Sequence, residues 1–215
     1  AYYYGLTFSA GTGATSSAIN FSTGTAAAAL WFDTCVMTVV GIGAAGDLNL
    51  GSTSGTATAQ LTVLINTNVQ VAAVGQQFVL QQAKFEWVGG TLTGTVFPTT
   101  LFATATGWRN NVLVHGVDLS NLGSGKNLVD VSGATPGGWI RFQQCKLGAS
   151  VTITTGAIVG QGGVIVQLDN CDSADTNYRM QRHQYQGDVY SETVVVRNGG
   201  ATDGTTRLAW RMVTS

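Results

Sequence analysis

A four-residue pattern of large apolar, polar, polar and small apolar positions returns along the chain at nearly constant spacing. Its clearest copy is Phe142-Gln143-Gln144-Cys145. The copies begin at Phe32, Leu61, Phe85, Val114, Phe142, Leu168 and Val196, which lie 24 to 29 residues apart. A recurrence of this length is typical of stacked, solenoid-like proteins.

Each interval has room for about three short strands and three corners, because a strand usually contains about 5–6 residues. Short β-branched runs lie between glycines, and no window has the periodicity of a helix. If each strand pairs in parallel with its equivalent one interval later, the chain is all-β and forms a parallel β-helix of about seven rungs. A β-sandwich or jelly roll also has many short strands, but it does not explain the near-constant interval.

Stacked rungs would place equivalent side chains directly over one another. The first pattern positions then form one inward column, and the fourth positions form a second. That second column contains Cys35, Leu64, Val88, Val117, Cys145, Cys171 and Gly199. Side chains alternate faces along a strand, which predicts two outward columns. One contains Asp33, Thr62, Glu86, His115, Gln143, Asp169 and Arg197, and the other contains Asp118, Lys146 and Asp172.

The three cysteines are expected to be buried free thiols that act as small apolar residues. A disulfide requires suitable geometry, and no histidine stands at metal-ligand spacing from them, so we expect no metal. Gly41-Ile42-Gly43-Ala44-Ala45-Gly46 matches a dinucleotide-binding pattern, but the helix that should follow it is missing. We therefore expect no cofactor.

Charge is sparse and uneven. Charged residues make up 10% of the chain, the net charge is −1, and residues 1–83 contain no Lys or Arg. Nothing favours binding to nucleic acid or to an anionic membrane, and no apolar run is long enough for a transmembrane helix. A surface with so little charge predicts that a partner, or copies of the chain itself, cover the first half.

One domain preceded by an N-terminal segment is expected. Residues 1–30 would cap the first rung or attach the chain to a partner, and 31–215 would form the β-helix. The adjacent Tyr2, Tyr3 and Tyr4 indicate a contact surface within the first segment. Because the chain starts without Met, we expect it to be a segment of a longer polypeptide or a trimmed one.

A polar and aromatic stretch interrupts the pattern near the C-terminus. Tyr, Arg and related residues are enriched at interface centres, so this stretch is a candidate recognition surface. Its candidate contact residues are Tyr178, Arg179, Arg182, His183, Tyr185 and Tyr190.

The closing stretch resembles a known protein class. Residues 192–206, which read ETVVVRNGGATDGTT, are followed by Leu208-Ala209-Trp210-Arg211-Met212-Val213-Thr214. Together with the turns FQQC and LDNC, this ending is similar to the last rungs of bacteriophage virion proteins that carry a right-handed parallel β-helix. The resemblance implies a virion protein that is present in several copies, possible trimers included, and that acts through contacts with other virion proteins.

Three functional classes remain open. The first is a non-catalytic virion component, such as a capsid decoration or a head or tail appendage. The second is a tailspike-like protein that binds or cleaves polysaccharide, for which the weak catalytic candidates are Asp169 and Asp172, or Asp118 with Asp172. The third is a cell-surface adhesin that binds a host glycan by stacking sugar rings on Trp87, Trp108, Trp139 and Tyr185.

Overall fold

The computed structural model describes residues 1–9, 19–21, 29–38, 47–51, 60–108, 110–132, 138–149, 151–155, 165–169, 171–173 and 193–197. All regular structure in these segments is β-strand, and they contain no helix. The predicted all-β class is confirmed.

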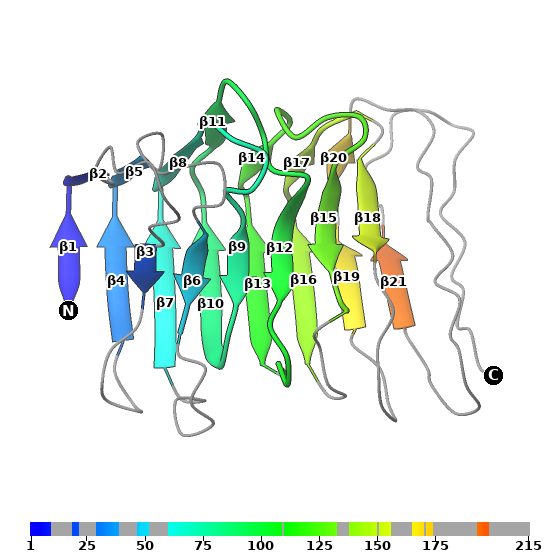
Figure 1. Cartoon of the computed structure of the whole chain (residues 1–215), viewed down its shortest axis with the longest axis horizontal. Coiled ribbons are helices and arrows are strands. Elements are labelled where there is room, and N and C mark those ends of the chain that lie inside the picture. The colour runs from blue at the N-terminus through cyan, green and yellow to red at the C-terminus, as the bar shows by residue number, and fades with distance from the viewer. Residues whose placement is uncertain are drawn as a thin grey trace.

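The strands form three layers, and the strands within each layer run parallel to one another (Figure 1). The first sheet contains β1 (Tyr2–Tyr4), β4 (Ala29–Asp33), β7 (Gln60–Ile65), β10 (Ala83–Val88), β13 (Asn111–His115), β16 (Trp139–Gln143), β19 (Ile165–Asp169) and β21 (Thr193–Arg197). The second layer contains β2 (Thr7–Ser9), β5 (Val36–Thr38), β8 (Asn68–Val71) and β11 (Leu92–Gly94), and a bridge between Thr91 and Asp118 leads to β14 (Asp118–Leu119), β17 (Lys146–Leu147) and β20 (Asp172–Ser173). The third sheet contains β3 (Ile19–Phe21), β6 (Leu48–Leu50), β9 (Phe78–Leu80), β12 (Thr100–Thr104), β15 (Asn127–Asp130) and β18 (Thr152–Thr155).

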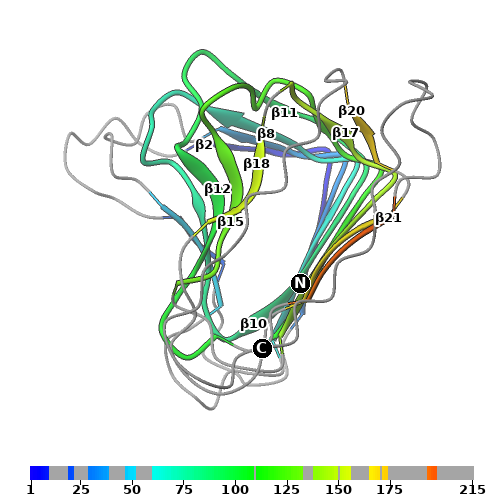
Figure 2. The same ribbon diagram turned by 90° about the vertical axis from the view of Figure 1, so that its right-hand side faces the viewer.

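Strands that neighbour each other in a layer are separated along the chain by strands of the other layers. The order β1-β4-β7-β10-β13-β16-β19 shows this most clearly, since each step passes one strand of each of the other layers. Every pairing recorded between the described strands is parallel, as such long connections require. Seen along its long axis, the molecule has its sheets arranged around a common interior (Figure 2).

The register of the first sheet corrects part of the predicted stacking. Val114, Phe142, Leu168 and Val196 do stack in register. However, Phe32 pairs with Leu64, Leu64 pairs with Trp87, and Trp87 pairs with Val114. The predicted members Leu61 and Phe85 therefore do not belong to this column. They were misplaced because β7 is apolar on both faces and because Phe85 and Trp87 both point into the core.

The same shift changes the predicted outward column. His115, Gln143, Asp169 and Arg197 are in register, as predicted. The residues that align with Asp33, however, are Ile65 and Val88. Thr62 is buried and Glu86 lies one column away, in register with Val63 and Leu113. The column Asp118, Lys146 and Asp172 is confirmed.

Left-handed corners explain the true register. The residue that follows each of the strands β1, β4, β7, β10, β13 and β16 adopts a positive φ and donates its N–H to the carbonyl of the last residue of the next strand in the first sheet. These residues are Gly5, Thr34, Asn66, Gly89, Gly116 and Gln144, with N···O distances of 2.8 to 3.0 Å. Glycine reaches this conformation without a steric cost, and asparagine does so more readily than most residues. Each corner residue therefore fixes the position at which the chain leaves its strand of the first sheet and turns.

The second inward column is also corrected by the corners. The residue next to Cys35 in this column is Thr67 and not Leu64. The Thr67 hydroxyl accepts the N–H of Cys35 at 3.2 Å and lies 2.9 Å from the carbonyl of Phe32. The following position is Gly90, where a Cβ would lie 2.2 Å from the Thr67 carbonyl. Val88 instead lies on the outer face, because its backbone aligns with Ile65 and His115.

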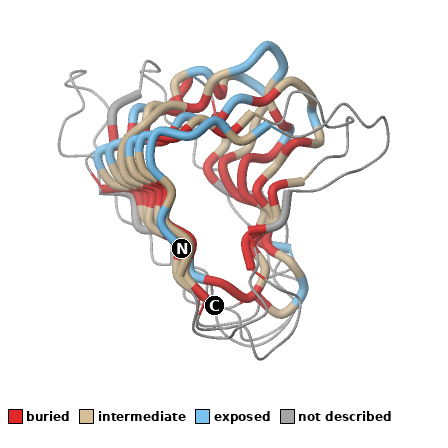
Figure 3. Tube along the Cα trace, turned by 90° about the vertical axis from the view of Figure 1, so that its left-hand side faces the viewer, coloured by how far each residue is buried: buried red, intermediate tan, exposed pale blue. Residues whose placement is uncertain are grey.

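Buried residues, red in Figure 3, recur at equivalent places in neighbouring strands, and the buried apolar side chains form one core cluster. Aromatic rings continue from rung to rung in the interior: Phe78 stacks on Phe102 with centroids 5.2 Å apart, and Phe102 lies 6.0 Å from Phe142. A second cluster stands at the N-terminal end, where Phe32 contacts Tyr3, Phe8 and Phe21. The described residues of the predicted cap 1–30 add β1, β2 and β3 to the three layers, and the predicted domain boundary stays a prediction.

Candidate functional site

The outer face of the first sheet has two chemically different regions. Over β1, β4, β7 and β10 it is largely aromatic and aliphatic, and we call it the apolar region. The apolar outward side chains that define this region are Tyr2, Tyr4, Trp31, Leu61, Val63, Ile65 and Val88. Val63 is covered by its neighbours, and the charged Asp33 lies between Tyr4 and Ile65 in the same column. The charged Lys84 and Glu86 lie at its border with the next strands. Residues 1–83 contain only two charged side chains, Asp33 and Asp47.

The polar region lies over β13, β16 and β19. Its central feature is Asp169, whose side chain is only 7% exposed although it is on the outer face. The Arg141 guanidinium, on the neighbouring strand, holds it through an Nε–H donated to Oδ2 at 2.6 Å and through a short ion pair from the terminal nitrogen. Gln167, two positions before Asp169, donates its amide to both carboxylate oxygens at 2.9 Å. The carboxylate is therefore enclosed by donors from two adjacent rungs.

Arg141 was not identified from the sequence as the partner of Asp169. The alternation of β16 was the available signal, because Arg141 and Gln143 both occupy outward positions next to Gln167 and Asp169. Further along the same face, the His115 Nδ1 lies 3.3 Å from the Gln143 Oε1. The polar region thus contains two hydrogen-bonded groups, Arg141 with Asp169 and Gln167, and His115 with Gln143.

A smaller polar site stands on the second layer. Lys146 Nζ lies 3.8 Å from Asp118 Oδ2, and the Ser120 amide and hydroxyl donate to Asp118 Oδ1 at 2.9 and 2.5 Å. Partial burial opposes ionisation of Asp118, but the Ser120 hydrogen bonds and the Lys146 charge outweigh it and place its pKa below the usual value. This carboxylate stays charged over the neutral range.

The geometry does not favour the carboxylate pair that a glycosidase would need. Asp169 is closed in by Arg141 and Gln167, whereas a general acid or nucleophile must reach its substrate. Asp172 belongs to β20 in a different layer, beyond the corner with buried Cys171. The other candidate pair is Asp118 with Asp172, and the β17 position of Lys146 lies between them in the ladder.

Two of the four candidate sugar-stacking residues are in the core. Trp87 and Trp108 are completely buried, and the Trp87 indole N–H donates to the Thr67 carbonyl at 3.0 Å. Trp139 occupies an outward position at the start of β16 and is partly exposed. Tyr185 lies outside the described residues. Of the described aromatic candidates, Trp139 alone remains available to a ligand.

The cysteines are free and buried, as predicted. Cys145 and Cys171 lie one rung apart and share a hydrogen bond between their thiols, which lowers the pKa of Cys145 and raises that of Cys171. Their sulfurs also lie against backbone carbonyls of the preceding rung, at 3.3 Å for Cys145 with Val114 and 3.5 Å for Cys171 with Phe142. These contacts fit a packing role. In the described segments, no cluster of histidine, cysteine or carboxylate groups is placed to hold a metal ion.

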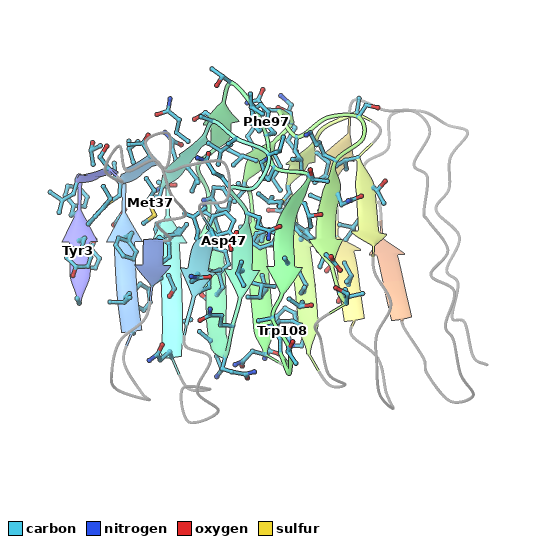
Figure 4. All side chains as sticks on the ribbon, viewed as in Figure 1. Tyr3, Met37, Asp47, Phe97 and Trp108 are labelled. Carbon is cyan, nitrogen blue, oxygen red and sulfur yellow. The ribbon has the colours of Figure 1, made fainter. Side chains whose placement is uncertain are left out.

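The N-terminal tyrosines occupy the end of the first sheet, where Figure 4 places Tyr3 on β1. Tyr3 points inward and stacks on Phe32 with centroids 5.1 Å apart, while Tyr2 and Tyr4 point outward and are 60% and 65% exposed. The Tyr2 hydroxyl donates to Asp33 at 2.6 Å. This hydrogen bond is the main cause that raises the pKa of Tyr2, because the neutral phenol is the donor.

The predicted recognition residues Tyr178, Arg179, Arg182, His183, Tyr185 and Tyr190 lie outside the described residues, as do the glycines between 41 and 46. Within the described segments, there is no helix that could cross a membrane.

No protein-family model, curated protein or solved structure matches this chain. Its function is therefore argued from the geometry of its own residues.

Proposed function

We propose that the chain is a right-handed parallel β-helix of about seven rungs and a non-catalytic structural component of a bacteriophage virion, either a capsid decoration or a head or tail appendage. The strand order and the parallel register support a coiled path. The right hand follows from the strong preference of parallel crossover connections.

One observation supports a contact role above all others, and it is the apolar region. Trp31, Leu61 and Ile65 stand on an outer sheet face within a stretch of 83 residues that has only two charged side chains. Large exposed apolar patches on a protein surface mark interaction sites more often than catalytic ones. Side chains of this kind form the buried centres of protein interfaces, while charges are depleted there.

Two of the described carboxylates support a non-catalytic role. Asp169 is held by Arg141 and Gln167, and Asp118 by Ser120 and Lys146. Each has a local structural partner that explains its position. A long ladder of parallel strands suits a rod-like protein that contacts its partners and does not catalyse a reaction.

Particle composition tests the proposal. Quantitative mass spectrometry of purified particles from the organism that encodes this sequence should find the chain in a fixed copy number. A number that follows icosahedral symmetry would assign it to the capsid, and a few copies per particle would assign it to the tail. Particles that lack the chain would reject the virion role.

A pair of variants tests which surface makes the contact. Leu61→Lys with Ile65→Lys places two charges in the apolar region, and attachment to particles depleted of the chain should be lost. Asn111→Lys with Gln143→Lys places the same charges at outward positions of the polar region, and attachment should be retained. Loss in the second variant and retention in the first would contradict the assignment.

A glycan-binding role is the second candidate, as in a tailspike-like protein or an adhesin, and Trp139 favours it. The indole is partly exposed on the outer face, next to the outward positions of Asn111 and Arg141. Aromatic faces with nearby amide and guanidinium donors suit sugar rings. Calorimetry with host surface glycans should show binding that Trp139→Ala abolishes and Trp108→Phe, a core substitution, preserves. The absence of heat with any glycan would remove this candidate.

A further inference from the structure

The β1 edge is the end of the first sheet. Within the described residues β1 pairs with β4 and with no other strand. The Trp31 N–H donates to the Ala1 carbonyl at 2.9 Å, and the Gly5 N–H donates to the Asp33 carbonyl at 3.0 Å. Alternate residues of a parallel strand bond to the same neighbour. Ala1, Tyr3 and Gly5 therefore face β4, and the backbone N–H and C=O of Tyr2 and Tyr4 face away from it.

The residues that the structure describes give this edge none of the usual protection. Exposed strand edges are normally guarded by lysine, by proline or by an inward-pointing charge. Here the sequence is Tyr2-Tyr3-Tyr4, and the adjacent strand β4 contributes one charged side chain, Asp33, whose carboxylate accepts the Tyr2 hydroxyl.

The free backbone groups are complementary to themselves. In an antiparallel pair, two facing residues exchange both of their backbone hydrogen bonds. If a second β1 approaches about a two-fold axis at Tyr3, the Tyr2 of each copy faces the Tyr4 of the other copy. All four outward residues then face a partner with a matching donor and acceptor. A parallel approach would place Tyr2 beside Tyr2 and would not give this exchange.

The side chains fit the same arrangement. Tyr3 is stacked on Phe32 with an interplanar angle of 19°, and Phe8 packs edge-on against it at 5.4 Å. Both rings are partly exposed, so a second Tyr3 would continue the aromatic column of the interior. On the outer face, tyrosine would lie opposite tyrosine, and such cross-strand aromatic pairs stabilise antiparallel strands.

We propose that two copies of this chain associate end to end through antiparallel pairing of their β1 edges, centred on Tyr3. The two first sheets become one continuous sheet, and the two apolar regions meet at the junction. The inference depends only on the β1 edge and stands apart from the proposed virion role.

The test is the mass of the 215-residue chain in solution. Sedimentation equilibrium at concentrations up to roughly 1 mM populates any pair held by more than about 4 kcal/mol. We expect a dimer with twice the 22.3 kDa chain mass. A chain that stays monomeric over this range overturns the proposal, whether or not it attaches to particles.

Tyr4→Pro is the variant that blocks the edge. The Tyr4 N–H faces away from β4, so proline leaves the internal ladder intact and removes a donor that the second copy needs. We expect a folded monomer, checked by circular dichroism and thermal unfolding. A dimer that persists in folded Tyr4→Pro overturns the proposal.

Charge variants give an independent test that needs no proline. Tyr2→Lys with Tyr4→Lys sets like charges opposite each other and should give monomers, as should Tyr2→Glu with Tyr4→Glu. Mixing these two variants should restore dimers. Tyr2→Lys with Tyr4→Glu sets opposite charges face to face in the antiparallel register only, and should dimerise by itself. Failure of both the mixture and this last variant, with the unsubstituted chain dimeric, would show that another surface is used.

Discussion

The apolar and polar regions of the first sheet share one backbone architecture and differ in many of their outward side chains, although Leu113 and Trp139 are apolar members of the polar region. Both lie on ladders of parallel strands with left-handed corners, as Asn66 in the first and Gly116 in the second show. In the apolar region the outward positions hold Trp31 and Ile65, and in the polar region Arg141 and Asp169 occupy the matching columns. The same strands and corners therefore accommodate different outward side chains, which leaves the chemistry of the outer face free to differ between the two regions.

The two regions also use different energetic terms. The apolar region gains from partial burial of large side chains, which is non-directional. The polar region depends on an enclosed carboxylate, whose hydrogen bonds must all be kept because an unpaired buried charge is costly. Substitutions should consequently be more damaging in the polar region, residue for residue.

The largest effect is expected from Arg141→Leu. It leaves the enclosed Asp169 carboxylate with Gln167 as its side-chain donor, and loss of charged hydrogen bonds of this kind costs about 1.5–3 kcal/mol. Denaturant unfolding measures the change. The control Gln143→Leu, on the same face of the same strand, should cost less than half as much; an equal loss in both variants would contradict the special role of Arg141.

A smaller loss is expected from Leu61→Thr with Ile65→Thr in the apolar region. Both side chains are only partly buried, so the pair should cost about 1–2 kcal/mol, well below the transfer free energy of two fully buried residues. Thermal unfolding in the Tyr4→Pro background, in which the chain is expected to be monomeric, gives this value. A loss above that of Arg141→Leu would reverse the ranking of the two regions.

The Asp118 site should contribute less than about 1 kcal/mol, since the ion pair with Lys146 is exposed. Because the folded pKa of Asp118 is lowered, its contribution is present above the ordinary aspartate pKa of about 3.9 and is lost as the pH falls through the folded pKa. NMR titration of Ser120→Ala should show the Asp118 pKa returning upward. An unchanged pKa would mean that Ser120 is not its main partner.

The smallest expected effect is at Tyr2. Its raised pKa means that the hydrogen bond to Asp33 is present below the ordinary tyrosine pKa of about 10 and is lost as the pH rises through the folded pKa. Ultraviolet titration should show one late phenol transition, which Tyr2→Phe removes and Asp33→Asn shifts down. If Asp33→Asn leaves every tyrosine transition in place, the contact is not formed in solution.

Much of the fold could be predicted from the sequence because inward columns repeat the same kinds of residue. Val114, Phe142, Leu168 and Val196 stack as the four-residue pattern indicates. The predicted register is wrong where that pattern is ambiguous. The rung from Phe32 to Leu64 is longer than its neighbours, and β7 is apolar on both faces, so hydrophobicity alone does not choose between Leu61 and Leu64.

The candidate site was less predictable. The outward position of Asp169 followed from strand alternation. The contact surface expected from the three adjacent tyrosines stays a prediction: Tyr2 and Tyr4 are exposed, whereas Tyr3 points inward and stacks on Phe32. The enclosure of Asp169 by Arg141 did not follow, because it joins residues 28 positions apart and depends on the register between rungs. The sequence predicts Trp87 and Trp108 as surface aromatics that could stack on sugar rings, but both are buried in the interior.

Disulfide formation across the first two complete rungs tests the register most directly. Asp33 and Ile65 are parallel neighbours with outward side chains, at a strand spacing of about 4.8 Å that suits a disulfide. Asp33→Cys with Ile65→Cys should therefore crosslink readily under mild oxidation, while Asp33→Cys with Thr62→Cys should not, because Thr62 is buried and three positions away. Efficient crosslinking in the second variant and none in the first would contradict the stacking on which both surfaces depend.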